Sequence, residues 1–173
     1  MLKFFAKYIW KFLPYQVRLY AVRRTQTHFT ASVVAVIFNE KREVLVLDHL
    51  IRPGATWGLP GGFCEPEEQP IEAIQRELKE ETGISLKNIQ LIRVRTIRRH
   101  HEILFRAESN EHDEVRSPEI KELGWFALDK IPDGMSEIQK NTVRELYEII
   151  TVKNLKRKVK FWIEIYPAIR KLI

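Results

Sequence analysis

The sequence predicts an α/β fold, and three features lead to that prediction. Two short apolar runs, ASVVAVIF at residues 31–38 and EVLVLD at residues 43–48, have the length and the β-branched content of buried strands. Residues 70–82 and 136–150 instead repeat apolar residues at the spacing of amphipathic helices. At 173 residues, of which 45% are hydrophobic, the chain has room for one domain with its own core.

The segments that follow the first strand are predicted in order along the chain. The polar residues NEKR at positions 39–42 suit a hairpin connection between the first two strands. Residues 49–62 are predicted to form an irregular loop, because residues that break regular structure are dense there. These residues are Pro53, Gly54, Gly58, Pro60, Gly61 and Gly62.

The first long helix has two recognisable ends. Pro70 suits the first helical position, and Gly83 suits the residue just beyond the last turn. Beyond it, residues 89–97, 101–108 and 121–128 are predicted to be strands, and residues 136–150 form the second helix.

Charge divides the chain into three parts. Residues 1–30 contain six Lys or Arg and no acid, and residues 151–173 contain seven Lys or Arg against Glu164 alone. Each end is therefore +6, and since the whole chain is also +6, residues 31–150 sum to −6. We expect a basic amphipathic N-terminal extension at 1–30, an acidic functional domain at 31–150, and a basic aromatic C-terminal helix or tail at 151–173.

The sequence favours a cytoplasmic location. Lys3, Lys7 and Lys11 interrupt the apolar N-terminus, so it lacks the continuous apolar region of a signal peptide. No stretch is long and apolar enough to span a bilayer. Cys64 is the only cysteine, which is consistent with a reducing compartment.

The basic ends have several interpretations. Lysines at every fourth position form one stripe if residues 1–13 are helical, and this pattern is typical of an interfacial helix on anionic lipid. The C-terminal segment adds Phe161, Trp162 and Tyr166 to a basic run. Peripheral membrane attachment, packing on the domain, a homodimer contact and RNA binding all remain open.

Acidic residues are concentrated on the first long helix and the loop before it. Residues 61–84 contain seven glutamates, and like charges one turn apart destabilise a helix by a few tenths of a kcal/mol per pair. Beside a predicted apolar stripe of Ile71, Ile74 and Leu78, three of the acids fall within an arc of about 100°. These are Glu77, Glu80 and Glu81. Oxygen donors gathered in this way suit Mg²⁺ or Mn²⁺.

The loop before the helix supports the same interpretation. Gly61 and Gly62 let the backbone approach a metal or a phosphate without a side chain in the way. Glu68 and Arg76 are expected to pair across the loop and the helix, because the planar guanidinium matches a carboxylate.

Residues 62–84 resemble the Nudix box. Gly62 is followed after five residues by Glu68, and after seven more by Arg76-Glu77-Leu78-Lys79-Glu80-Glu81-Thr82-Gly83-Ile84, which fills every position of that motif. The wider resemblance runs over residues 31–150, with WGLPGG at 57–62 and PEIKELGWFALDKIP at 118–132. The resemblance implies the Nudix fold, an α/β/α sandwich with a mixed β-sheet.

The resemblance also implies site residues and a reaction. Glu77, Glu80 and Glu81 match metal ligands, the Gly61 carbonyl matches a further ligand, and Arg76 and Glu68 match the pair that braces the loop. The implied reaction is metal-dependent attack of water on a phosphorus of a nucleoside diphosphate linked to another group. The base is expected to be Glu80 or Glu81. Candidates for the base outside the motif are Glu102, Glu119 and Glu122.

Other residues have a structural and a functional interpretation. Trp57 is expected to stack on a base or to pack on the core, and Cys64 to fill the loop rather than to act as a nucleophile. The residues Arg98, Arg99, His100 and His101 face a phosphate or form a solvated strand edge. Asp48 and His49 leave the second strand toward the loop and are candidates for shaping a pocket.

The substrate is not determined by the motif. No Pro or Tyr occurs between Ile84 and Ser117, which weakens assignment to the ADP-ribose and dinucleoside polyphosphate groups of the family. Markers of its NADH and coenzyme A groups are also missing. The alternative from another class is a catalytically silent Nudix-like module that binds a nucleotide as a sensor.

Overall fold

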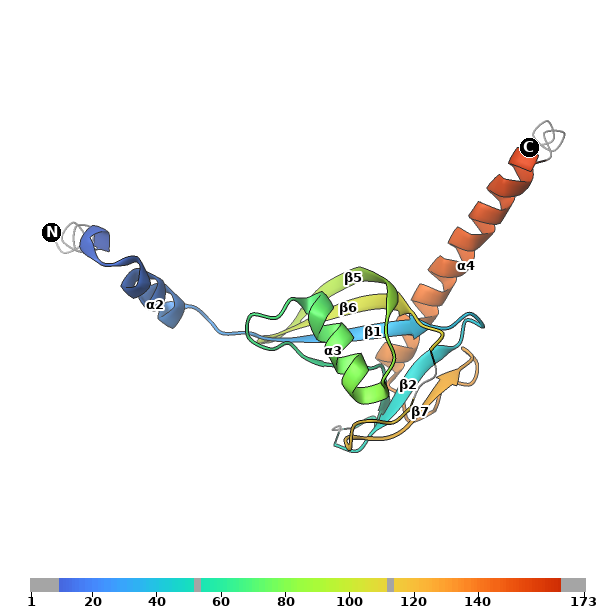
Figure 1. The fold of residues 1–173 in the computed structure, drawn as a ribbon, viewed down its shortest axis with the longest axis horizontal. Coiled ribbons are helices and arrows are strands. Elements are labelled where there is room, and N and C mark those ends of the chain that lie inside the picture. Colours follow the sequence, from blue (N-terminus) through green and yellow to red (C-terminus); the bar gives the residue numbers. More distant parts are fainter. Residues whose placement is uncertain (1–9, 52–53, 112–113, 166–173) are drawn as a thin grey trace.

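The computed structural model describes residues 10–51, 54–111 and 114–165, with side chains described as far as residue 152. Within these residues the chain forms one seven-stranded mixed sheet between two helices, with a separate N-terminal helix (Figure 1). The strands are β1 (Thr30–Phe38), β2 (Val44–His49), β3 (Trp57–Gly58), β4 (Gly61–Phe63), β5 (Lys87–Ile97), β6 (His100–Glu108) and β7 (Ile120–Phe126).

The sheet is mixed because β1 pairs in parallel with β6 and antiparallel with its other partners. The central path runs β3-β2-β1-β6-β5, with β4 paired to β1 and β7 paired to β2. The β1–β6 pairing is continuous from Thr30 opposite His100 to Phe38 opposite Glu108. β4 pairs with the N-terminal half of β1, whereas β2 pairs with β1 only at the C-terminal end of β1, where Phe38 lies opposite Val44.

Strand β1 supplies both layers of the core. Its side chains alternate, so that Val33, Ala35 and Ile37 pack on one face and Val36 and Phe38 on the other. Helix α3 (Pro70–Thr82) covers the first face through its buried residues Ala73, Ile74 and Leu78. Helix α4 (Glu137–Ile165) covers the second through Val143 and Leu146. The predicted α/β/α sandwich is therefore confirmed.

Both ends of helix α3 form as the sequence predicts. Pro70 occupies the first helical position, and the backbone N–H of Gln69 donates to the Glu72 carboxylate over 3.0 Å. At the other end Gly83 has φ +75°, in the left-handed region, and its N–H donates to the Lys79 carbonyl over 3.1 Å. The prediction from residue types at these two positions is confirmed.

The structure corrects the predicted apolar stripe of α3. Ile71 points to the same side of the helix as Leu78, but its side chain is 45% exposed. It lies in the first turn, before Ala73, the first buried residue, and the core does not extend to that turn. A helical wheel shows on which side of a helix a residue lies, but it does not show whether that turn of the helix packs against the core.

One further segment differs from expectation, and another takes one of its two expected forms. The segment predicted to be an irregular loop contains β3 and β4, which are stabilised by pairing with β2 and β1 rather than by their own residues. Helix α4 continues past residue 150 to Ile165 without interruption. The basic composition after residue 150 therefore does not end the helix.

The N-terminal helix α2 (Tyr15–Thr25) is separate from the sandwich (Figure 1). It has no buried residue. Residues 10–12 are also helical and end before Pro14, while most of the stripe predicted over residues 1–13 lies outside the described residues. The sequence did not predict a helix at 15–25.

Replacing Leu78 by Ala should destabilise the protein far more than replacing Ile71. Leu78 is fully buried against β1, so its truncation leaves a cavity and should cost about 3 kcal/mol in the free energy of unfolding. Ile71→Ala removes an exposed side chain of similar size from the same helix and should cost no more than about 1 kcal/mol. Urea denaturation of both variants measures the difference, and equal losses would contradict the packing of α3 described above.

Candidate active site

Strand β4 is a glycine strand that lies between helix α3 and strand β1. Gly61 pairs with Val34, and Gly62 pairs with Val33. Gly61 has φ +149°, and a Cβ at this position would overlap the Val33 carbonyl. A Cβ at Gly62 would overlap the carboxyl group of Glu77. The two glycines are therefore needed for two different close approaches, one to the neighbouring strand and one to the helix.

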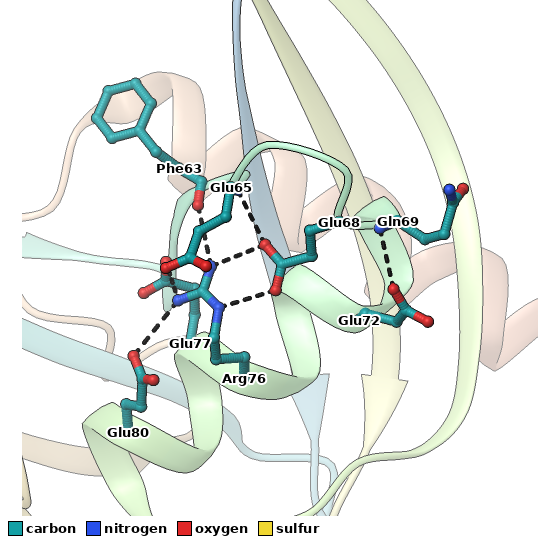
Figure 2. A network of polar contacts seen from close by, with 8 residues as sticks. All are labelled: Phe63, Glu65, Glu68, Gln69, Glu72, Arg76, Glu77 and Glu80. Carbon is teal, nitrogen blue, oxygen red and sulfur yellow. Dashed lines mark hydrogen bonds and ion pairs between the residues drawn. The ribbon is translucent and has the colours of Figure 1, made fainter.

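A single arginine connects the loop to helix α3 (Figure 2). The Arg76 Nε donates to Glu68 Oε1 over 2.8 Å, and its Nη2 donates to Glu68 Oε2 over 3.0 Å, which makes the pair bidentate. The same Nη2 donates to the carbonyl of Phe63 over 3.1 Å. The predicted pairing of Glu68 with Arg76 is confirmed, and it holds the end of β4 as well as the loop.

Arg76 also contacts two of the predicted metal ligands. Its Nη1 donates to Glu77 Oε1 over 2.9 Å and to Glu80 Oε2 over 3.3 Å. The like charges of residues 61–84 are therefore compensated in part by a guanidinium from within the motif.

These contacts change the acidity of the groups involved. Two hydrogen bonds from Arg76 and one from the backbone N–H of Glu65 lower the pKa of Glu68 from 4.5 to about 2. Pairing with Glu68 raises the pKa of Arg76. The pKa of Glu77 is raised, because its burial disfavours the carboxylate more than Arg76 stabilises it.

The described residues contain no cluster of three or more His, Cys, Asp or Glu side chains arranged to hold a metal ion. The donor chemistry nevertheless fits a hard cation, since the carboxylates of Glu77 and Glu80 and the backbone carbonyl of Gly61 are all oxygen donors. Because Gly62 has no side chain, the Glu77 carboxyl packs directly against the backbone of β4. The Glu80 side chain is 61% exposed and has freedom to move away from Arg76.

Glu81 lies in the last turn of α3. Its side chain is half-buried, and its backbone carbonyl accepts the N–H of Arg116 over 3.0 Å. The loop that carries Arg116 therefore covers this end of the helix.

A pocket of about 360 Å³ opens beside β4. Its wall on the sheet comes from the face that α4 covers further along, with Ser32 and Val34 of β1 and Glu102 of β6. The Glu77 carboxyl lies against Gly62, which pairs with Val33, whose side chain packs on the opposite face. Gly62 and Val33 also contribute to the lining, so the pocket reaches the backbone of β4. The remaining lining residues are His49, Ile51, Leu59, Gly61, Phe63 and Glu119.

The candidate bases outside the motif take different positions. Glu102 and Glu119 both line this pocket. Glu122 is exposed on β7 opposite Asp48 and is not part of the lining. Asp48 is buried and pairs with Lys121 at 3.5 Å, so of the two residues leaving the second strand only His49 reaches the pocket.

The two histidines of β6 do not form a solvated strand edge. His100 is within hydrogen-bonding distance of Thr30 Oγ1 at 2.7 Å and of Ser32 Oγ at 2.8 Å, and the Phe63 ring meets it edge-on at 5.8 Å. The His101 ring stacks on Phe29 with the centroids 4.6 Å apart. The imidazole rings of His100 and His101 therefore both make contacts within the protein.

Trp57 and Cys64 have structural surroundings. The Trp57 ring packs edge-on against Phe126 at 5.5 Å, next to the core that α4 covers. Cys64 is half-buried, and burial together with the charge of Glu68 raises the pKa of its thiol. Core packing for Trp57 and loop filling for Cys64 are the interpretations that fit.

Sequence reasoning missed Ser32 and Phe63 as pocket residues. Ser32 is a polar residue within an apolar strand, and in an alternating strand this is a sign of a face that is not fully covered. Phe63 carried no comparable sign, because its position depends on the pairing of β4 with β1, where it lies opposite Ser32.

Comparison with known proteins identifies the family. The model of the NUDIX domain family matches residues 28–146, so the chain belongs to the Nudix family. The predicted family and fold are confirmed. The box residues Glu68 and Arg76 form the pair described above, and Gly62 lies against the Glu77 carboxyl.

Individual relatives cover different shares of the chain. A MutT-like protein of Streptomyces ambofaciens is 31% identical over 111 residues, which are 63% of this chain and 71% of that protein. The 8-oxo-dGDP phosphatase NUDT18 of Mus musculus is 44% identical over 63 residues, 36% of this chain. This chain matches only 20% of the length of NUDT18.

A solved structure matches the fold over most of the chain. It is the NUDIX domain of Shewanella oneidensis NrtR, determined in complex with ADP ribose, with a TM-score of 0.61 at 19% identity. The match covers 84% of this chain and 97% of that one. In the part of the chain that the structure describes, no helix has the length and hydropathy to cross a membrane.

Stability should depend on Glu68 in a defined range of pH. Because folding lowers the pKa of Glu68 from 4.5 to about 2, the ionised carboxylate stabilises the native state above pH 4.5, and this contribution is lost as the pH falls toward 2. The wild-type protein should therefore have a higher urea midpoint than Glu68→Gln at neutral pH, with a difference that shrinks between pH 4.5 and 2.

The matched control is Glu65→Gln, which removes an acid of the same loop whose contact to Glu68 is made by its backbone N–H. Its difference from the wild-type protein should show no such change with pH. A Glu68→Gln difference that stays constant from neutral pH down to pH 2 would be inconsistent with the pairing to Arg76.

Proposed function

We propose that the protein is a divalent-metal-dependent hydrolase that cleaves the diphosphate bond of a nucleoside diphosphate linked to another moiety. The observation that carries the proposal is the position of Gly61 and Gly62 between the Glu77 carboxyl on one side and the pocket on the other. Residues 31–150 would contain the complete catalytic unit. Membership of the Nudix family supports the reaction class.

The proposed metal ligands are Glu77, Glu80, Glu81 and the carbonyl of Gly61. When bound, Mg²⁺ or Mn²⁺ would neutralise charge on the diphosphate and lower the pKa of a coordinated water. Arg76 and Glu68 keep the loop in position, which matters because positioning and charge stabilisation account for most of the catalysis of phosphoryl transfer. Glu80 or Glu81 accepts the proton of the attacking water.

The position of the pocket supports a proposed orientation of the substrate. The box carboxylates lie toward α3 and the pocket opens on the other side of β4, so a substrate that reaches both has its diphosphate across the glycine strand. The absence of side chains on Gly61 and Gly62 allows this approach. One end of the substrate then occupies the pocket that Ser32 and Glu102 line.

The first experiment is a substrate panel at saturating Mg²⁺. It contains nucleoside triphosphates, nucleotide sugars, CDP-alcohols and dinucleoside polyphosphates, together with ADP-ribose and 8-oxo-dGDP, which occur in the names of similar proteins. Glu77→Gln should lower kcat about 10²- to 10⁴-fold on the best substrate, because it removes the negative charge and one carboxylate oxygen of a partly buried proposed metal ligand. Released phosphate after coupled phosphatase treatment measures turnover.

The matched control is Glu72→Gln, which neutralises another acid of α3 that lies at the N-terminus of the helix and contacts Gln69. Its kcat should stay within about threefold of the wild-type value. Turnover that is equal in the wild-type protein and in Glu77→Gln would contradict the proposed site. Tight nucleotide binding without turnover would instead support the sensor alternative.

We further propose that a cytoplasmic pool of the protein docks on anionic bilayers through its N-terminal segment. Residues 1–30 carry six basic residues and no acid, and helix α2 has no buried residue. The described part of this segment exposes Trp10, Phe12, Tyr15 and Tyr20. Basic residues with exposed aromatic rings suit a surface of lipid phosphates. The C-terminal basic residues would extend the same attraction.

Full-length protein should float with phosphatidylcholine vesicles that contain phosphatidylserine and not with pure phosphatidylcholine. Replacing Lys11, Arg18, Arg23 and Arg24 by Gln should weaken the partitioning about 10²- to 10³-fold, at roughly 1 kcal/mol per basic residue near the surface. The matched control replaces four exposed basic residues of the domain, Lys41, Lys87, Arg99 and Lys130.

Equal flotation of the two fourfold variants would contradict docking through the N-terminal segment. Wild-type protein that floats with neither kind of vesicle would also contradict docking on anionic bilayers. Concentration-dependent sedimentation of the wild-type protein alone would then indicate a homodimer, and retention on single-stranded RNA would indicate the nucleic-acid alternative.

A further inference from the structure

A second arginine–carboxylate pair lies at the pocket, outside the motif. Arg95 of β5 and Glu102 of β6 are directly opposite each other in the antiparallel ladder. The Arg95 Nε lies 2.7 Å from Glu102 Oε1, and its Nη2 donates to Glu102 Oε2 over 3.0 Å. The guanidinium therefore contacts both carboxylate oxygens, Oε2 through a hydrogen bond and Oε1 through an ion-pair contact, whereas Glu68 accepts two hydrogen bonds from Arg76.

Glu102 belongs to the pocket and Arg95 lies behind it. The Glu102 side chain lines the pocket together with Ser32 and Gly61, whereas Arg95 is not part of that lining. Arg95 lines a separate cleft between β5 and α4. One residue of the pair thus faces the space proposed for the substrate, and the other holds it from outside.

Arg93 provides a comparison within the same strand. It lies two residues from Arg95 on the same face of β5, and the two side chains are 37% and 35% exposed. The Nη2 of Arg93 donates to Thr142 Oγ1 over 3.0 Å, and its Nη1 lies 3.8 Å from Glu145, so it is directed toward α4. Arg93 and Arg95 therefore have the same charge and similar exposure, but Arg93 contacts residues of α4 whereas Arg95 contacts Glu102.

We propose that Arg95 is a positioning residue that fixes the Glu102 carboxylate in the pocket beside β4. The inference rests on the proposed hydrolase function. A planar guanidinium that hydrogen-bonds one carboxylate oxygen and lies 2.7 Å from the other restricts the orientation of the carboxylate, whereas a lysine ammonium would attract it as a point charge. The orientation of a group that contacts substrate strongly affects rate, since small displacements from productive geometry are costly.

The test uses full-length protein and the best substrate of the panel. Arg95→Gln should lower kcat about 10- to 100-fold with a smaller change in KM, and Arg95→Lys should restore only part of the loss. Arg93→Gln should stay within about threefold of the wild-type kcat. Urea midpoints of all variants show that the native state is populated during the assay.

A double-mutant comparison separates positioning from a general structural effect. If Arg95 acts through Glu102, Arg95→Gln should cause no further loss of kcat in a Glu102→Gln background. Multiplicative losses in the double variant, or equal losses in Arg93→Gln and Arg95→Gln, would overturn the inference. So would Arg95→Gln with the wild-type kcat.

These outcomes are distinct from a failure of the proposed function. Absence of Glu77-dependent turnover in the wild-type protein overturns the hydrolase and the role of Arg95 with it. Glu77-dependent turnover that is insensitive to Arg95→Gln overturns the role of Arg95 alone.

Discussion

The guanidinium of Arg76 is the contact on which the arrangement of the site depends. It donates to three carboxylates, Glu68, Glu77 and Glu80, and to the backbone carbonyl of Phe63. Without it, like charges would face each other at a partly buried position, where an uncompensated carboxylate is costly. The same guanidinium joins the end of β4 to α3, so one side chain both compensates the acidic charges and holds the loop in position (Figure 2).

The glycine strand β4 is the second constraint, since it brings two surfaces of the molecule together. Gly61 lies close against β1, and Gly62 lies against the Glu77 carboxyl. Side chains at either position would push the strand away from one neighbour. The strand is stabilised by pairing with β1, and through it the α3 side of the sheet and the pocket on the α4 side meet at one backbone.

Local features of the site were predictable, and distant ones were not. The ends of α3 and the pairing of Glu68 with Arg76 follow from residues within one helix and one short loop, where geometry is set by helical spacing. The partnership of Glu102 with Arg95, and its place beside Ser32, depends on the registers of β6 with β5 and with β1. Ile71 shows the same limit within a helix. Helical spacing places it on the apolar side of α3, but its burial depends on whether the core extends to the first turn.

The amino-acid sequence alone was enough to predict the family, the order of the longer strands and of the two helices of the sandwich, the limits of α3 and the residue types available for a metal. Each of these follows from spacing along the chain or from local backbone preference. The folded structure was needed to show that Arg76 reaches Glu77 and Glu80 and that residues 57–58 and 61–63 form strands. It was also needed to show that Glu102 and Glu119 enter the pocket while Glu122 does not. The physical reason is that strand register and side-chain contacts between distant segments are set by packing of the whole sheet, which no local pattern encodes.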